Sequence, residues 1–301
     1  MAKGIIPISL TYPAILGHHV TGYVHSVGDG VARFKKGDRV YTMSAVALRN
    51  DHRFGGHQRY TLSGQTLTAH IGNTPFEEAA SASALYAAMS ALTIYLKLDR
   101  PSKNPDPENK DKKVLIWGGG STLGFFAIQI ASQAGYTVIT TASPSHSEAL
   151  LQVGATQVVS YHLSPSTLLN NLLSHGPYTA VLDASSSPSS QTTISEILSA
   201  QGGGTFLSTM GVNSSITLPK NVKGVFVQYA DDYLKPEMED YARWVFWEFL
   251  EEGFRDGKLT MGEVEVIGGL DVLGDGLGRL QRGEVRGRKL VVKPNLELHT
   301  H

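Results

Sequence analysis

The chain has 301 residues, of which 41% are hydrophobic and 18% are charged, and its formal net charge is −1. This composition excludes global disorder and suits one large domain or two ordinary ones. The near-zero charge argues against a nucleic-acid partner, which requires a basic face. The absence of cysteine excludes disulfides, a cysteine nucleophile and thiolate zinc sites. Without a signal-peptide pattern or an apolar run of about 18 residues, we expect a cytoplasmic protein with no membrane partner.

The first part of the chain has the pattern of short strands separated by glycine turns. Strand-like segments lie at 22–27, 40–43 and 60–62. This pattern predicts a small β-rich barrel or sandwich. A helix is expected from Pro75 to residue 98, and the Pro-, Asn- and Lys-rich residues 99–113 mark the clearest boundary.

Residues 114–230 alternate between strands and helices. The expected strands are 114–117, 137–141, 157–160, 180–183, 204–208 and 225–228. The expected helices are 123–134, 147–151, 166–173 and 194–200. This order predicts an α/β fold with a doubly wound parallel sheet of the Rossmann type. A long aromatic helix is then expected over 236–256, and after it strands at 264–267 and 289–293 on either side of a helix near 273–280.

A glycine-rich turn, Gly118-Gly119-Gly120-Ser121-Thr122-Leu123-Gly124, follows the first of these strands and opens a helix. Glycines let the backbone approach a pyrophosphate, and the helix N-terminus offers N–H groups and the positive end of a dipole. The spacing has one residue more than G-x-G-x-x-G, so a simple tight turn is the alternative interpretation.

The end of the second strand bears on which dinucleotide binds. NAD enzymes place an acid there for the ribose hydroxyls, but the first acid in this stretch is Glu148. This favours NADP(H), with Ser143, Ser145 and His146 as donors to a 2′-phosphate. Against it, no Lys or Arg occurs from Val114 to Pro219, although a phosphate usually has a cationic partner.

Several collinear motifs resemble the medium-chain dehydrogenase/reductase superfamily. They include Leu16-Gly17-His18-His19, Phe34-Lys35-Lys36-Gly37-Asp38-Arg39-Val40, the glycine turn, Phe76-Glu77-Glu78-Ala79-Ala80 and Arg288-Lys289-Leu290-Val291-Val292. Together they are similar to the zinc-independent quinone and enoyl reductases. The segments Thr141-Ala142-Ser143-Pro144 and Gly268-Gly269-Leu270 look most like the fungal trans-acting enoyl reductases that serve polyketide synthases.

The resemblance implies a GroES-like substrate domain over residues 1–98, a Rossmann domain over 114–230, and a segment 231–301 that returns to the substrate domain, with a cleft between the domains. It implies hydride transfer from NADPH to an activated C=C bond. The cofactor contacts carried over are Gly119, Gly120, Ser121, Thr122 and Leu123 for the pyrophosphate, and Ser143, His146 and Tyr161 for the adenosine phosphate.

The chain departs from the family pattern in two respects. The zinc members use Cys and His ligands, and His18 falls on the histidine position, but with no Cys we expect no metal site. His19 stands where the family has an acid. The family's first strands, which carry a tyrosine near the substrate, precede the point where this sequence begins, so a truncated GroES-like domain is expected.

Three side chains are the candidates for acid–base chemistry: His18 and His19, beside an expected strand, and Tyr86, within the small-residue helix. Imidazoles exchange protons near neutral pH. The alternative for each is a packing or hydrogen-bonding role. Asp183 ends a strand at the sheet edge where ligands bind, and it can equally cap a turn in the serine-rich loop that follows.

The first functional hypothesis is therefore an NADPH-dependent, zinc-independent reductase of an enone or enoyl thioester. The expected substrate is small and hydrophobic or carrier-bound, and a polyketide synthase is the expected partner. A second hypothesis is a non-redox cyclase or isomerase of a polyketide-like intermediate, and a third is a non-catalytic partner of a synthase. Residues 225–228 are expected to offer an apolar strand edge on which a homodimer can form.

Overall fold

The computed structural model describes residues 11–44, 50–227, 229–285 and 287–294. The chain divides into two compact units. Unit 1 comprises residues 1–83 and 231–301, and unit 2 comprises residues 84–230. The helical segment after residue 84 therefore belongs with the parallel sheet, whereas the sequence analysis grouped it with the N-terminal strands.

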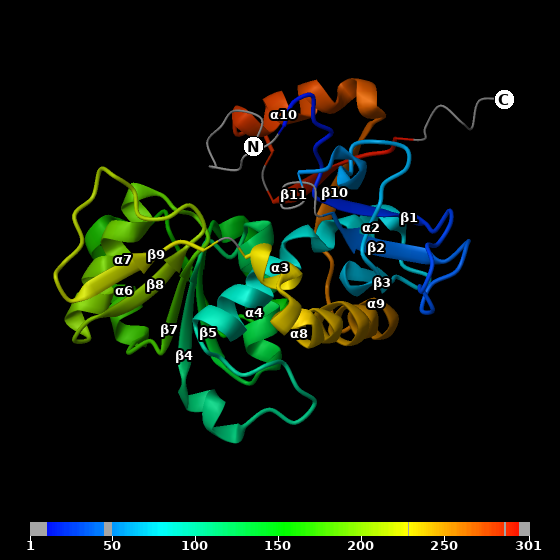
Figure 1. Ribbon diagram of the computed structural model, residues 1–301. Coiled ribbons are helices and arrows are strands. Elements are labelled where there is room, and N and C mark those ends of the chain that lie inside the picture. The colour runs from blue at the N-terminus through cyan, green and yellow to red at the C-terminus, as the bar shows by residue number, and fades with distance from the viewer. Residues whose placement is uncertain (1–10, 45–49, 228, 286, 295–301) are drawn as a thin grey trace. The chain divides into compact units, whose positions relative to one another are not determined.

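Unit 2 contains a six-stranded parallel sheet in the order β6-β5-β4-β7-β8-β9 (Figure 1). The strands are β4 (Lys113–Trp117), β5 (Thr137–Ala142), β6 (Gln157–Ser160), β7 (Ala180–Asp183), β8 (Gly204–Ser208) and β9 (Val222–Val225). The helices between them are α4 (Thr122–Gln133), α5 (Ser147–Gln152), α6 (Pro165–His175) and α7 (Pro188–Ala200). This topology confirms the doubly wound sheet.

The core of unit 2 follows from the two-residue period of its strands. Leu115 and Trp117 of β4 point to one face, where they join a buried cluster with Leu172 of α6 and Ile194 of α7. Val114 and Ile116, which alternate with them, are fully buried as well. Strands buried on both faces read as continuous apolar runs, which is why β4 was recognisable from the sequence.

Unit 2 also contains helical segments before the first strand of the sheet and between β5 and α5. The segment from Leu85 is helical in two parts, α3 (Leu85–Met89) and the π-helical η4 (Ser90–Tyr95), and α3 packs on α4. The predicted loop 99–113 contains a short 3₁₀ turn, η5 (Pro107–Asp111). A second 3₁₀ turn, η6 (Pro144–His146), links β5 to α5.

Unit 1 contains a small antiparallel sheet in the order β1-β2-β3 and a parallel pair, β10-β11. The strands are β1 (His19–Tyr23), β2 (Arg39–Met43), β3 (Thr68–His70), β10 (Glu263–Gly268) and β11 (Arg288–Val292). Its helices are α2 (Phe76–Ala80), α8 (Glu239–Arg243), the π-helical η9 (Trp244–Leu250), α9 (Glu251–Asp256) and α10 (Leu273–Gln281). Its short helical turns are η1 (His52–Phe54), η2 (Gln65–Leu67), η3 (Ser81–Ala84, one residue into unit 2), η7 (Asp231–Leu234), η8 (Pro236–Met238) and η10 (Leu270–Val272).

Three strand predictions are wrong. The strand expected at 22–27 is His19–Tyr23, and residues 24–27 form no strand. Residues 60–62 form no strand, and the third strand of the small sheet is instead Thr68–His70. The last strand of the large sheet was expected at 225–228 but is Val222–Val225, and residue 228 lies outside the described residues. Within the residues that the structure describes, no helix is long and apolar enough to cross a membrane.

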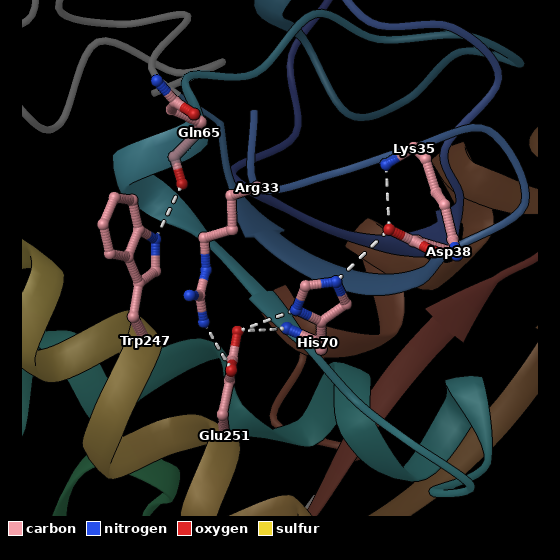
Figure 2. A network of polar contacts seen from close by, with 7 residues as sticks. All are labelled: Arg33, Lys35, Asp38, Gln65, His70, Trp247 and Glu251. Carbon is pink, nitrogen blue, oxygen red and sulfur yellow. Dashed lines mark hydrogen bonds and ion pairs between the residues drawn. The ribbon is translucent and has the colours of Figure 1, made fainter. Parts of the chain in front are cut away.

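A polar network in unit 1 ties helix α9 to the small sheet (Figure 2). His70, at the end of β3, lies between two carboxylates, with Nε2 3.3 Å from Oδ2 of Asp38 and Nδ1 3.1 Å from Oε1 of Glu251. The second oxygen of Glu251 accepts a hydrogen bond from Arg33 at 2.6 Å. The network joins residues about 180 to 220 positions apart in the sequence, so it fixes the return of the C-terminal segment onto unit 1.

Candidate functional site

The glycine turn connects the end of β4 to the start of α4. Gly118 adopts φ +86°, a conformation that favours glycine. Ser121 is the N-cap: its Oγ accepts from the backbone N–H of Gly124 at 3.0 Å and donates to the carbonyl of Gly118 at 2.9 Å. The remaining N–H groups of the first turn have no partner within the helix and lie at the positive end of its dipole. Such a turn is suited to an anion.

The turn packs against β5 more closely than any residue with a side chain would allow. A Cβ on Gly119 would lie 2.4 Å from Oγ1 of Thr140. The N–H of Gly118 donates to Oγ1 of Thr141 at 3.0 Å, and the N–H of Gly119 donates to the Thr141 carbonyl at 2.9 Å. The backbone of the turn is thus held against β5 without side chains at its three glycines, which suits the approach of a pyrophosphate to the N-terminus of α4.

Three predicted residues for the adenosine phosphate come from adjacent strand ends. Ala142 is paired with Ser160, so the residues that follow them, Ser143 and Tyr161, also leave the sheet side by side. His146 lies in η6, with Nδ1 2.7 Å from Oγ of Ser143, and its ring is 3.6 Å from the Cβ position of Gly120. Tyr161 is 46% exposed. The structure therefore places all eight predicted cofactor residues in unit 2, at the carboxyl ends of β4, β5 and β6.

A second polar cluster lies along the same sheet edge, at the ends of β7 and β8. Oδ1 of Asp183 accepts from the backbone N–H groups of Ser185 and Ser186 at 3.1 and 3.0 Å, and from the hydroxyl of Ser190 at 3.1 Å. The hydroxyl of Ser186 lies 2.8 Å from Oγ of Ser208. Asp183 thus orders the serine-rich loop. Of the two interpretations given for Asp183, ligand binding and turn capping, these hydrogen bonds fit turn capping.

Ser186 and Ser208 were not predicted from the sequence to belong to this polar cluster. The signal that would have found Ser208 is its position as the last residue of β8, which pairs with Asp183, the last residue of β7. Parallel strands end at one edge of the sheet, so polar residues that end neighbouring strands meet there. Burial raises the pKa of Asp183 above its ordinary value, and the hydrogen bonds that it accepts oppose this rise.

The two histidine candidates lie in unit 1. His19 opens β1, its ring centroid is 5.0 Å from that of His18, and it stacks on Tyr41 at 5.8 Å. Burial lowers the pKa of His18, and burial together with His18 and Lys289 lowers the pKa of His19 well below its ordinary value. Both imidazoles are therefore neutral near pH 7, when each has one N–H donor and one acceptor nitrogen.

Tyr86, the third candidate, is half-buried on α3 of unit 2. Among the described residues, no group of three or more His, Asp or Glu side chains gathers in a way that could hold a metal ion. His18 therefore has no set of co-ligands in the described part of the chain.

Comparisons with known proteins agree with this architecture. Residues 1–91 match the family model of the alcohol dehydrogenase GroES-like domain. The chain is 31% identical over 290 residues to the trans-enoyl reductase himH of Aspergillus japonicus, and the match covers 94% of this chain and 82% of that protein. It is 27% identical over 273 residues to the trans-enoyl reductase RAP1 of Pyricularia oryzae, covering 86% of this chain and 76% of that one.

Among solved structures, a putative zinc-dependent alcohol dehydrogenase of Rhizobium etli matches with a TM-score of 0.74 and 22% identity, over 93% of this chain and 81% of that one. At this identity the likeness concerns the fold alone.

Proposed function

This chain belongs to the medium-chain dehydrogenase/reductase superfamily as an oxidoreductase of the enoyl or quinone reductase type, and we propose that it uses NADPH to reduce an activated C=C bond. The proposed substrates are enones or enoyl thioesters of fungal polyketide metabolism. The trans-enoyl reductases of Aspergillus japonicus and Pyricularia oryzae support this class of substrate.

The observation that carries the proposal is the bare glycine turn capped by Ser121. The turn presents the N-terminus of a 12-residue helix at the carboxyl edge of a parallel sheet. Gly119, Gly120, Ser121, Thr122 and Leu123 would hold the pyrophosphate of the dinucleotide there. When bound, NADPH supplies the hydride of the reaction.

The preference for NADPH over NADH rests on the end of β5. An acid at this position would bind the ribose hydroxyls of NAD and repel a 2′-phosphate, but the chain continues from Ala142 to Ser143, Pro144, Ser145 and His146. Hydroxyl and imidazole donors suit a phosphate. Ser143 and His146 would hold the 2′-phosphate, with Tyr161 beside the adenosine.

The remaining chemistry belongs to side chains of this chain. Hydride addition to the β-carbon of the substrate would leave an enolate, which hydrogen-bond donors stabilise until a proton is delivered to complete the reduction. Neutral His18, neutral His19 and the Tyr86 hydroxyl are the candidate donors. We propose that no zinc takes part, because the chain has no cysteine and its described residues form no cluster of metal ligands.

We further propose that the substrate reaches the enzyme on a carrier of a polyketide synthase, and that the enzyme works in the cytoplasm. A homodimer is a separate proposal, because β9 is the outermost strand on its side of the described sheet. Its exposed Lys223 makes this edge less apolar than was expected from residues 225–228. A dimeric mass in solution would support that proposal, and a monomeric mass would contradict it.

The test is to incubate the enzyme with NADPH and a panel of enones and enoyl thioesters and to follow both nicotinamide absorbance and product mass. We expect NADPH consumption together with a product two hydrogens heavier. An isomeric product without NADPH consumption would contradict the reductase and favour the cyclase or isomerase. No turnover, combined with tight binding to a synthase, would favour a non-catalytic partner.

A further inference from the structure

The region that would receive the 2′-phosphate has no permanent cation in its own part of the chain. From Val114 to Pro219 the only basic side chains are His146, His162 and His175. A phosphate monoester carries between one and two negative charges near neutral pH, because its second pKa is about 6. Charge-assisted hydrogen bonds are roughly twice as strong as neutral ones, so the charge on a histidine here would change the affinity.

His146 is the histidine that the local structure holds in place. Its Nδ1 lies 2.7 Å from Oγ of Ser143 and 3.3 Å from Oγ of Ser145, and these two hydroxyls are 3.0 Å apart. Its ring lies beside Gly120 of the glycine turn, with Cγ 3.6 Å from the Cβ position of that glycine. The hydroxyls fix one edge of the ring, and no described residue forms a hydrogen bond with Nε2.

The elements around His146 carry few charges that would override its own. The described helix α4 contains no charged residue, and neither does β5. In α5, Glu148 is exposed and lies 3.4 Å from Nε2 of Gln152. Beyond β6, His162 packs its ring against Tyr161 with centroids 4.6 Å apart. The titratable side chains on these elements are therefore Glu148, Tyr161 and His162. On the other side of the glycine turn, Asp183 pairs with Trp117.

From this geometry we infer that His146 sets the cofactor preference through its protonation, so that affinity for a 2′-phosphorylated cofactor rises when the imidazole is charged. The inference rests on the proposed use of NADPH. In the imidazolium, Nδ1–H donates to the Ser143 hydroxyl and Nε2–H is a charged donor for the phosphate. The neutral ring has two arrangements: Nδ1–H donates to Ser143 and Nε2 is only an acceptor, or the Ser143 hydroxyl donates to Nδ1 and Nε2–H is an uncharged donor. Both hold a phosphate less strongly than the imidazolium does.

The test is calorimetric binding of NADP⁺ and NAD⁺ at about pH 5 and about pH 8, the two ends of the range in which histidines change charge. For the unaltered chain we expect the NADP⁺-to-NAD⁺ affinity ratio to fall by about tenfold toward the higher pH. Adenosine 2′,5′-bisphosphate and adenosine 5′-monophosphate serve as a second pair of probes. They differ only in the 2′-phosphate and report binding without the nicotinamide.

Three variants assign the effect. His146→Gln keeps a donor but has no charge, so its affinity ratio should be low and should vary with pH only as the phosphate itself titrates. His146→Arg should keep the ratio high at both pH values. His175→Gln, at the far end of α6, is the matched control and should behave as the unaltered chain does. Equal melting temperatures verify that the variants fold.

The outcomes separate the inference from the proposed function. If NADP⁺ binds with an affinity ratio that does not depend on pH, or if His162→Gln removes the dependence while His146→Gln retains it, the inference is overturned and NADPH use stands. If neither dinucleotide binds at either pH, the proposed function itself is contradicted, and the inference fails with it.

Discussion

His70 and Glu251 are 181 residues apart in the sequence, yet Oε1 of Glu251 accepts from the backbone N–H of His70 at 2.9 Å and lies 3.1 Å from its Nδ1 (Figure 2). Arg33 bonds the other oxygen of Glu251, and its guanidinium carbon lies 4.7 Å from the ring centroid of Trp247. Trp247 in turn donates to the carbonyl of Gln65 at 3.0 Å. One carboxylate thus joins helix α9 to β3 and to the loop before β2.

We expect Glu251→Ala to destabilise unit 1 by about 1–3 kcal/mol, because hydrogen bonds to charged groups are among the stronger ones and the backbone donor loses its partner. Thermal unfolding followed by circular dichroism measures this loss. Glu248→Ala, an exposed glutamate three residues earlier in η9, is the control and should change stability by less than about 0.5 kcal/mol. Equal effects of the two variants would show that the network does not hold the helix.

Acid should weaken the same network through Asp38. The backbone N–H of Lys35 and then His70 lower the pKa of Asp38 below its ordinary 3.8. A carboxylate with a lowered pKa in the folded state stabilises the fold above pH 3.8, and this contribution is lost as the pH falls through the lower folded value. The unfolding midpoint should therefore drop less steeply in acid for Asp38→Asn than for the unaltered chain. Asp29→Asn, at an exposed carboxylate earlier in the same loop, is the control substitution and should not reproduce the effect of Asp38→Asn.

Asp183 yields a contrast between two substitutions. Its raised pKa means that the folded state loses stability as the pH rises from 3.8 through the folded value, because a buried carboxylate is then formed. Asn at this position keeps an acceptor for the Ser185 and Ser186 N–H groups and carries no charge. Asp183→Asn should therefore be within about 1 kcal/mol of the unaltered chain at neutral pH, whereas Asp183→Ala should lose at least about 2 kcal/mol.

Urea unfolding at pH 7 measures both Asp183 variants. The two variants should differ clearly in their free energy of unfolding, because the acceptor oxygen rather than the negative charge orders the loop. Equal stability of Asp183→Ala and Asp183→Asn would mean that the serine-rich loop does not depend on this side chain.

The sequence predicted those parts of the fold in which local pattern and burial agree. The apolar runs of β4 and β7 ended where expected, since strands covered on both faces are apolar throughout. The start of α7 at Pro188 was missed by six positions because Ser187 and Ser190 cap each other, a signal hidden in a run of serines. Capping of this kind depends on side-chain positions rather than on apolar periodicity.

The position of β9 was missed for a reason that lies in the packing. Gly224 is paired with Phe206, and a Cβ on Gly224 would lie 2.4 Å from a methyl carbon of Val212 and 2.8 Å from the Phe206 ring. Strand β9 therefore includes Gly224, because a glycine lets its backbone approach Phe206 and Val212 closely. The more apolar residues that follow Val225 lie outside the strand. For the candidate site, the glycine turn was visible in the sequence, whereas the contact between His146 and Gly120 depends on the η6 turn.

Gly119→Ala tests whether the bare backbone of the turn is required. The added methyl group would lie 2.4 Å from Oγ1 of Thr140, so we expect a loss of about 1–3 kcal/mol from overpacking and a marked loss of dinucleotide affinity. Gly64→Ala is the matched control, because its Cβ position has no neighbour within 4 Å, and it should be neutral or slightly stabilising. Unchanged affinity in a folded Gly119→Ala protein would contradict the assignment of the turn.

The central claim, that this chain is an NADPH-dependent reductase, is tested most directly by titrating the purified protein with NADPH and, separately, with NADH. The binding should be read by calorimetry and by nicotinamide fluorescence. We predict saturable binding of NADPH at a one-to-one ratio and much weaker binding of NADH. Absence of binding for both dinucleotides would contradict hydride transfer and redirect the search to cofactor-free cyclisation or isomerisation.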